Sequence, residues 1–114
     1  TPFAHDLAVA WSHRQEELVK RAGFTMMATL AVHDKAASNE VFCTYLNRVH
    51  EAATDERHNV KKGVNWALRQ IGKRNPILNR AAIRTAKRIR EMDSRAARWI
   101  AADALRELER WKPR

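Results

Sequence analysis

Apolar residues recur along this chain at the three- and four-residue spacing of an α-helix, and no segment alternates as a strand would. The pattern predicts a short helix over residues 4–10 and five longer helices after it. We place the longer helices at residues 14–32, 39–53, 57–72, 77–90 and 95–111. Gly72 and Pro76 end the third long helix, and Asp93 with Ser94 precedes the fifth as a cap. The sequence therefore predicts an all-α fold.

Each long helix carries one apolar stripe that is expected to face the core. In chain order, the stripes comprise Val19, Gly23, Met26, Met27 and Leu30; Phe42, Tyr45, Leu46 and Val49; Val60, Val64, Ala67, Leu68 and Ile71; Leu78, Ala82, Ala86 and Ile89; and Ala97, Ile100, Ala104, Leu108 and Trp111. Five such stripes predict helices that pack side by side.

A weak internal repeat sets the expected architecture. Residues 19–23 align with residues 60–64, and the last apolar stripe follows the third at a similar offset of about 40 residues. Two helices in a period of about 40 residues are typical of HEAT-like repeats, which stack into a curved solenoid with a concave binding surface. We expect antiparallel helix pairs in a short curved solenoid. Residues 1–114 should form a single HEAT-like unit, the C-terminal part of a longer repeat protein.

Trp66 lies on the polar side of the third long helix. At about 100° per residue it falls roughly opposite the apolar stripe, beside Lys62, Arg69 and Lys73. A large ring among cations suits a partner that has phosphates and flat bases, which indicates nucleic acid. The alternative is that Trp66 is buried against a neighbouring helix of a stacked array.

Arg21 occupies the corresponding face of the first long helix. If equivalent helices line the concave surface, Arg21 points into it together with Trp66 and the three cations beside it. The alternative is an exposed Arg21 that pairs with Glu17 at the preceding helical turn, an interaction of little energetic value.

The net charge of the 114 residues is +9, and it is concentrated in the centre of the chain. Residues 56–98 contain 13 Lys and Arg against 3 acidic residues, a net charge of +10, which leaves −1 for the rest. Such a block is expected of a surface that faces phosphates. The alternative is a basic, solvated surface that serves solubility.

Several classes of protein are excluded or disfavoured. No apolar run approaches the roughly 20 residues that cross a bilayer, so we expect no membrane partner. Cys43 is the single cysteine, which excludes an internal disulfide and suits a reducing cytosol or nucleoid. Phosphate loops, nucleophile elbows and metal-ligand spacings are absent, so no cofactor and no metal are expected. No obligate protein partner is indicated either.

Three segments, taken in order, resemble the AlkD-like DNA alkylation repair proteins. Residues 60–76, Val-Lys-Lys-Gly-Val-Asn-Trp-Ala-Leu-Arg-Gln-Ile-Gly-Lys-Arg-Asn-Pro, resemble the signature helix of that family. Trp11 and Ser12, followed by residues 17–24, are similar to the preceding repeat, and residues 97–108 are similar to the closing helix. The likeness covers nearly the whole chain.

The resemblance implies a HEAT-like DNA glycosylase that removes cationic alkylpurines such as 3-methyladenine and 7-methylguanine from double-stranded DNA. In this family the base is not flipped into a pocket. Two tryptophans and an aspartate contact the deoxyribose, and the carboxylate stabilises oxocarbenium character on the sugar. Trp66 matches the second tryptophan, which makes it the catalytic candidate, and Arg21 matches an arginine that contacts the DNA backbone. Lys62, Arg69 and Lys73 are the other expected DNA-binding residues.

One part of the family pattern has no match in residues 1–114. The other tryptophan and the aspartate belong to an earlier repeat, so the resemblance places them before Thr1. We therefore expect this chain to form half of the cleft and the isolated chain to be inactive. The alternatives are a HEAT-like scaffold that binds nucleic acid without chemistry, and a protein-interaction module whose basic cleft holds an acidic peptide.

Overall fold

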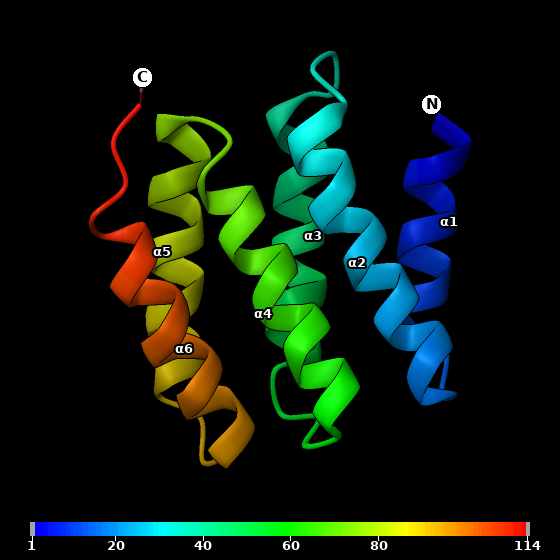
Figure 1. The fold of residues 1–114 in the computed structure, drawn as a ribbon, viewed down its shortest axis with the longest axis vertical. Helices are drawn as coiled ribbons and strands as arrows, with labels where there is room; N and C mark the ends of the chain where they lie inside the picture. Colours follow the sequence, from blue (N-terminus) through cyan, green and yellow to red (C-terminus); the bar gives the residue numbers. More distant parts are fainter. Residues whose placement is uncertain (1, 114) are drawn as a thin grey trace.

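The computed structural model describes residues 2–113 and consists of helices joined by short loops (Figure 1). In chain order the helices are α1 (Pro2–Ser12), α2 (Glu17–His33), α3 (Asn39–Ala52), α4 (His58–Gly72), α5 (Pro76–Arg90) and α6 (Arg95–Leu108). No strand occurs within the described residues. The all-α prediction is confirmed.

The helices form a slab of two layers that measures 34 × 32 × 17 Å. In Figure 1, α2, α4 and α6 lie side by side in the front layer and run in the same direction, while α3 and α5 run oppositely behind them. The contacts agree with this order, because α2 packs against α4, α4 against α6, and α3 against α5. This is the predicted stack of antiparallel helix pairs, with α1 added at one end against α2.

The hydrophobic core lies between the two layers. The stripes predicted for α3, α4 and α5 are buried as expected, and so are Ala97, Ile100, Ala104 and Leu108 of α6. The apolar stripes thus identify most of the buried side chains of these helices, although Ala52 of α3 and Ala96, Ala101 and Leu105 of α6 are buried as well.

Helix α2 differs from the prediction at its start and in its buried face. It begins at Glu17 rather than at residue 14. Phe24 and Ala31 are fully or almost fully buried, whereas Val19, Met26 and Leu30 are only partly buried. Because α2 packs against α1 and α4 as well as the rear layer, its buried face is wider than one stripe and is rotated from the predicted one.

Helix α6 ends at Leu108, three residues earlier than predicted. Trp111 therefore lies outside the helix and is partly exposed, so its assignment to the core is wrong. Asn79 of α5 provides a reason for this end, because its Nδ2 donates to the Leu108 carbonyl at 3.1 Å and to the Gly72 carbonyl at 3.0 Å. One side chain thus satisfies a carbonyl at the C-terminal end of both α4 and α6.

The front helices are joined by a repeated cap. The Glu17 carboxylate accepts a hydrogen bond from the Asn59 backbone N–H at 3.1 Å, at the start of α4. One repeat later, the Glu56 carboxylate accepts from the Ala96 backbone N–H at 3.1 Å, at the start of α6. A carboxylate at a helix N-terminus satisfies a free N–H and complements the helix dipole. The repeat inferred from the apolar stripes is therefore present in the polar contacts as well.

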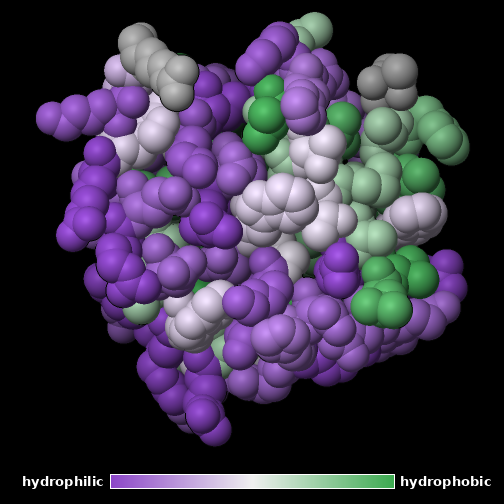
Figure 2. Space-filling view, viewed as in Figure 1, coloured by the Kyte–Doolittle hydropathy of each residue, from purple (hydrophilic) through white to green (hydrophobic). Residues whose placement is uncertain are grey.

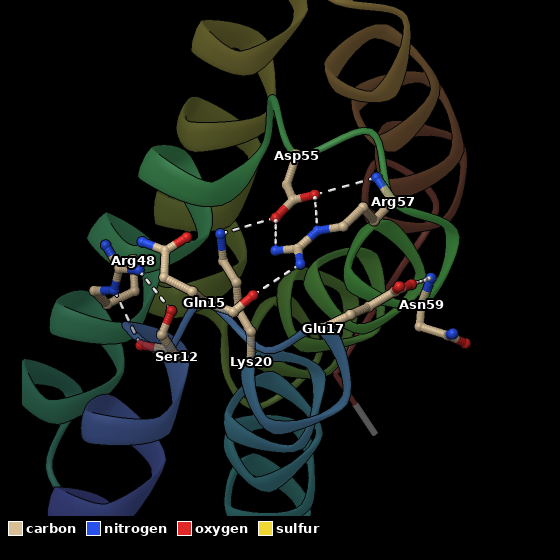
Figure 3. Close-up of polar contacts among 8 residues, drawn as sticks. All are labelled: Ser12, Gln15, Glu17, Lys20, Arg48, Asp55, Arg57 and Asn59. Atoms are coloured by element: carbon tan, nitrogen blue, oxygen red, sulfur yellow. Dashed lines mark hydrogen bonds and ion pairs between the residues drawn. The ribbon is translucent and has the colours of Figure 1, made fainter.

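An ion-pair network centred on Asp55 fixes the loop before α4 against α2 (Figure 3). The Asp55 carboxylate accepts from the Arg57 guanidinium at 2.8 Å and 3.1 Å and from Lys20 Nζ at 2.9 Å. Arg57 also donates to the Gln15 carbonyl at 2.8 Å, which reaches the loop between α1 and α2. The hydrogen bonds from Arg57, followed by those from Lys20, hold the pKa of Asp55 well below its ordinary value of 3.8.

Asp55→Asn should lower the free energy of unfolding by about 2 kcal/mol at neutral pH, because the side chain is only 12% exposed and three charged contacts are lost. Since folding lowers the Asp55 pKa, its contribution is complete above the ordinary value of 3.8 and is lost as the pH falls below it. Urea unfolding at neutral and acidic pH should therefore show a smaller acid-induced loss in the variant. An equal loss in both proteins would contradict this assignment.

Gly23→Ala should destabilise the protein by roughly 2–3 kcal/mol, because overpacking against backbone cannot relax easily. A Cβ atom at this position would lie 2.8 Å from the Ala8 carbonyl and 2.9 Å from Ser12 Cα of α1. Gly63→Ala is the matched control, since its nearest neighbour is the flexible Arg21 side chain at 3.3 Å. Thermal melts of both variants should separate them, and a similar loss in both would refute the steric argument.

Candidate nucleic-acid interface

Trp66 lies on the outer surface of α4, on the face formed by α2, α4 and α6. Its side chain is 38% exposed, so the alternative of burial against a neighbouring helix is wrong. Figure 2 shows this face, where hydrophilic side chains gather over α4 and α6 and hydrophobic ones over α1 and α2. The ring is therefore displayed on the more polar part of the surface, as its position off the apolar stripe predicts.

A hollow of about 490 Å³ surrounds Trp66, and three helices contribute to its wall. It is lined by Arg21, Thr25, Lys62, Gly63, Asn65, Trp66, Arg69, Trp99 and Asp103. Four of the five residues predicted to share a groove are thus together. Lys73 lines an adjoining hollow, which shares Arg69 and Asp103 with the first.

Arg21 and Lys62 are exposed cations, and neither forms an ion pair within the described residues. Glu17 is not the partner of Arg21, because its carboxylate caps α4 instead. Gly63 allows the Arg21 side chain to lie close against α4, since a Cβ atom there would be 3.3 Å from Arg21 Cγ. Both charges are consequently free to meet a phosphate.

Unlike Arg21 and Lys62, the cations Arg69 and Lys73 are paired with carboxylates of α6. Arg69 Nε donates to Asn65 Oδ1 at 2.9 Å, and its Nη1 lies 3.3 Å from Glu107. Lys73 Nζ lies 3.3 Å from the same Glu107 carboxylate. Asp103 adds a further carboxylate oxygen 3.7 Å from Arg69 Nε. Carboxylates of α6 therefore offset part of the positive charge that the sequence assigns to this end of the groove.

Five residues of the hollow lie outside the predicted set, and two of them, Trp99 and Asp103, come from α6. Trp99 of α6 is 37% exposed, and the ammonium groups of Lys61 and Lys62 lie 5.1 Å and 5.3 Å from its ring centroid. The sequence did carry a signal, because Trp99 falls off the apolar stripe of α6 just as Trp66 falls off that of α4. Asp103 lies one turn further along and pairs with Arg106 at 3.2 Å.

Asn65 lines the hollow, and one of its two side-chain hydrogen-bonding groups has no partner in the described part of the chain. The side chain is 3% exposed, and its Oδ1 accepts from Arg69. Its Nδ2 has no hydrogen-bond partner within the described residues. A buried donor without a partner destabilises a protein by about 1–3 kcal/mol unless something binds it.

No group of three His, Cys, Asp or Glu side chains in residues 2–113 is arranged to hold a metal ion. Over the same residues, no helix has the length and apolar character that crossing a membrane requires.

The fold and this face define an α-helical repeat protein with a basic surface that displays tryptophan. The sequence model of the family described as DNA alkylation repair enzyme matches residues 2–108, and the chain belongs to that family. The resemblance found in the sequence is thereby confirmed, together with a role in DNA alkylation repair in which DNA is the substrate. Searches of curated proteins and of solved structures gave no match.

Proposed function

We propose that this protein is a DNA glycosylase that excises cationic alkylated purines, such as 3-methyladenine and 7-methylguanine, from double-stranded DNA. The observation that carries the proposal is Trp66, an exposed ring that shares one hollow with two unpaired cations, Arg21 and Lys62. The cations bind phosphates on either side of a lesion, and the ring lies against the sugar between them.

The reaction breaks the bond between C1′ of the deoxyribose and the purine nitrogen, and water supplies the oxygen that replaces it. The bonding electrons leave with the alkylated base, whose positive charge they neutralise, so the base needs no proton. Positive charge then develops on the sugar. The electron-rich face of Trp66 stabilises that charge, an interaction worth about 0.5–2 kcal/mol. The proton of the attacking water goes to a carboxylate or to solvent.

The carboxylate of Asp103 is a poor candidate for this step. It lies 3.2 Å from Arg106 and 3.7 Å from Arg69, so two guanidinium groups already offset its charge. We assign the stabilising carboxylate to another repeat of the protein, as the family resemblance implies. Asp103→Asn should then change the rate of base release by less than about threefold, because a surface pair of this kind contributes little. A loss of a hundredfold or more would instead identify Asp103 as the catalytic carboxylate.

The decisive experiment incubates the longer protein, including the repeat to which we assign the carboxylate, with duplex DNA that contains 7-methylguanine and measures the free base by chromatography. Release that exceeds spontaneous depurination supports the glycosylase, with untreated duplex as the control. A second candidate function is a non-catalytic DNA-binding scaffold, which is favoured by the double pairing of Asp103 in the hollow. Tight binding to methylated DNA without any base release would select the scaffold.

A further inference from the structure

We infer that the outer side of α5, on the rear of the slab, is a second DNA-binding surface, so that one protein molecule holds two duplexes at once. The inference goes beyond the proposed glycosylase and does not depend on it, because it requires only that DNA is the substrate of this family. The surface is a stripe of four exposed cations, which we call the α5 stripe: Arg80, Arg84, Lys87 and Arg88.

Half of the excess charge of the central block lies on α5 rather than in the groove around Trp66. Residues 76–90 contain five Arg and Lys and no acidic residue, against the net charge of +10 for residues 56–98. None of these five cations forms an ion pair within the described residues. None of them lines the hollow around Trp66 or the adjoining one. The basic block that the sequence assigns to one phosphate-facing surface is therefore divided between two faces.

Helical geometry places the α5 stripe on the side of α5 away from the core. At about 100° per residue the four cations fall within about 100° of arc, roughly opposite the buried Leu78, Ala82 and Ile89. Because α5 belongs to the rear layer, this side faces away from α2, α4 and α6 (Figure 1). A duplex in the front groove cannot reach it, since DNA is too stiff to fold around a slab that is 17 Å thick. A duplex at the α5 stripe is therefore a second one.

Neither solubility nor the helix dipole accounts for the α5 stripe. Like charges one turn apart, such as Arg80 with Arg84 and Arg84 with Arg88, destabilise a helix, and a soluble surface usually intersperses charges of both signs. The dipole favours cations in the last turn, which explains Lys87 and Arg88 but not the two arginines nearer the start. Glu91 follows the helix directly and forms no ion pair in the described part of the chain. Bound phosphates would relieve this repulsion.

The length and the composition of the α5 stripe fit one strand of DNA. From Arg80 to Arg88 the helix rises about 12 Å at roughly 1.5 Å per residue. One strand of a duplex presents about four phosphates over that length, at roughly 3.4 Å each. Guanidinium groups bind phosphate oxygens through two parallel N–H donors. A membrane or a protein partner requires an apolar contact surface as well, and Ile77 is the only large apolar side chain of α5 that is exposed.

The front groove should bind the first duplex more tightly than the α5 stripe binds the second. In the groove, Trp66 and the hollow around it add contacts to those of the cations, whereas the α5 stripe supplies charge alone. Binding of the second duplex should therefore depend strongly on salt. With about four phosphate contacts, its affinity should fall about a hundredfold between about 50 and 200 mM salt.

The test measures how many short duplexes one protein molecule carries. Sedimentation velocity with a fluorescently labelled duplex in excess, at about 50 mM salt, should give a complex of one wild-type protein and two duplexes. Arg80→Gln combined with Arg84→Gln and Arg88→Gln should lower the affinity for the second duplex by at least about tenfold, which leaves one duplex per protein. Glutamine is a good helix former and the three side chains are exposed, so thermal melts of the variant and wild type should agree.

Arg14→Gln combined with Arg98→Gln and Lys112→Gln is the matched control. It removes the same formal charge from outside α5, so it should still carry two duplexes. The inference is overturned if wild type carries one duplex, or if the control loses the second duplex as the α5 variant does. If wild type carries one duplex and also binds polyglutamate through the α5 stripe, the partner is an acidic polypeptide instead of DNA.

Base release by the longer protein separates this inference from the proposed function. Two duplexes per protein without any release of 7-methylguanine would refute the glycosylase and leave the second surface standing. Release with one duplex per protein would refute the second surface and leave the glycosylase standing. In the α5 variant of the longer protein the rate of release should stay within about twofold of wild type, because the α5 stripe does not line the hollow around Trp66.

Discussion

In the longer protein that includes the repeat bearing the carboxylate, Trp66→Ala is expected to slow the release of 7-methylguanine from methylated duplex DNA by about twofold to thirtyfold. The ring supplies roughly 0.5–2 kcal/mol towards positive charge on the sugar, and each 1.36 kcal/mol in the barrier changes the rate tenfold. Because that charge exists only in the transition state, binding of undamaged duplex should change by less than twofold. Single-turnover release of the base and anisotropy with undamaged DNA measure the two quantities.

Trp66→Phe and Trp111→Ala are the controls for this prediction. Phenylalanine keeps a ring with a weaker attraction for cations, so its rate should fall between those of wild type and the alanine variant. Trp111 lies beyond the end of α6 and lines only the adjoining hollow, so its replacement should change the rate far less than that of Trp66. If Trp66→Ala had no effect on release, the role that the family resemblance gives to this position would be wrong.

The sequence was sufficient to predict the helices and most of the hydrophobic core between the two layers. In α4 and α5 the predicted stripes contain every apolar side chain that is fully buried, from Val60 to Ile89. Periodicity was insufficient for α2, which packs on α1 and α4 in addition to the rear layer. Phe24 is buried there although it lies beside the predicted stripe, because contacts on several sides widen the buried arc.

The candidate site, too, could be predicted from the sequence only in part. Trp66 could be predicted because it is a local anomaly, an aromatic residue on the polar face of its own helix. The pairing of Arg69 and Lys73 could not, because their partner Glu107 is on α6, more than thirty residues away, and only the packing of α6 against α4 brings it near. A count of basic residues along the chain therefore overstates the positive charge that is available at this end of the groove.

This difference in pairing gives the last prediction, which concerns the salt dependence of DNA binding. Arg21→Ala combined with Lys62→Ala should reduce the slope of log affinity against log salt by about two units, since each unpaired cation releases about one counterion from DNA. At about 0.1 M salt that change corresponds to a loss of affinity of roughly ten- to a hundredfold, and the loss should be the same on damaged and undamaged duplexes.

Arg69→Ala combined with Lys73→Ala removes the same formal charge from the adjoining part of the groove and is the matched comparison. Here the slope should change by less than about one unit, because Glu107 and Asp103 already offset these cations and remain behind when they are removed. Titrations of wild type and the two double variants against one undamaged duplex at several salt concentrations test the difference. If the two double variants lost equal slope, DNA would be displacing the carboxylates of α6 from Arg69 and Lys73. If neither lost any, the phosphates would lie on another face of the protein.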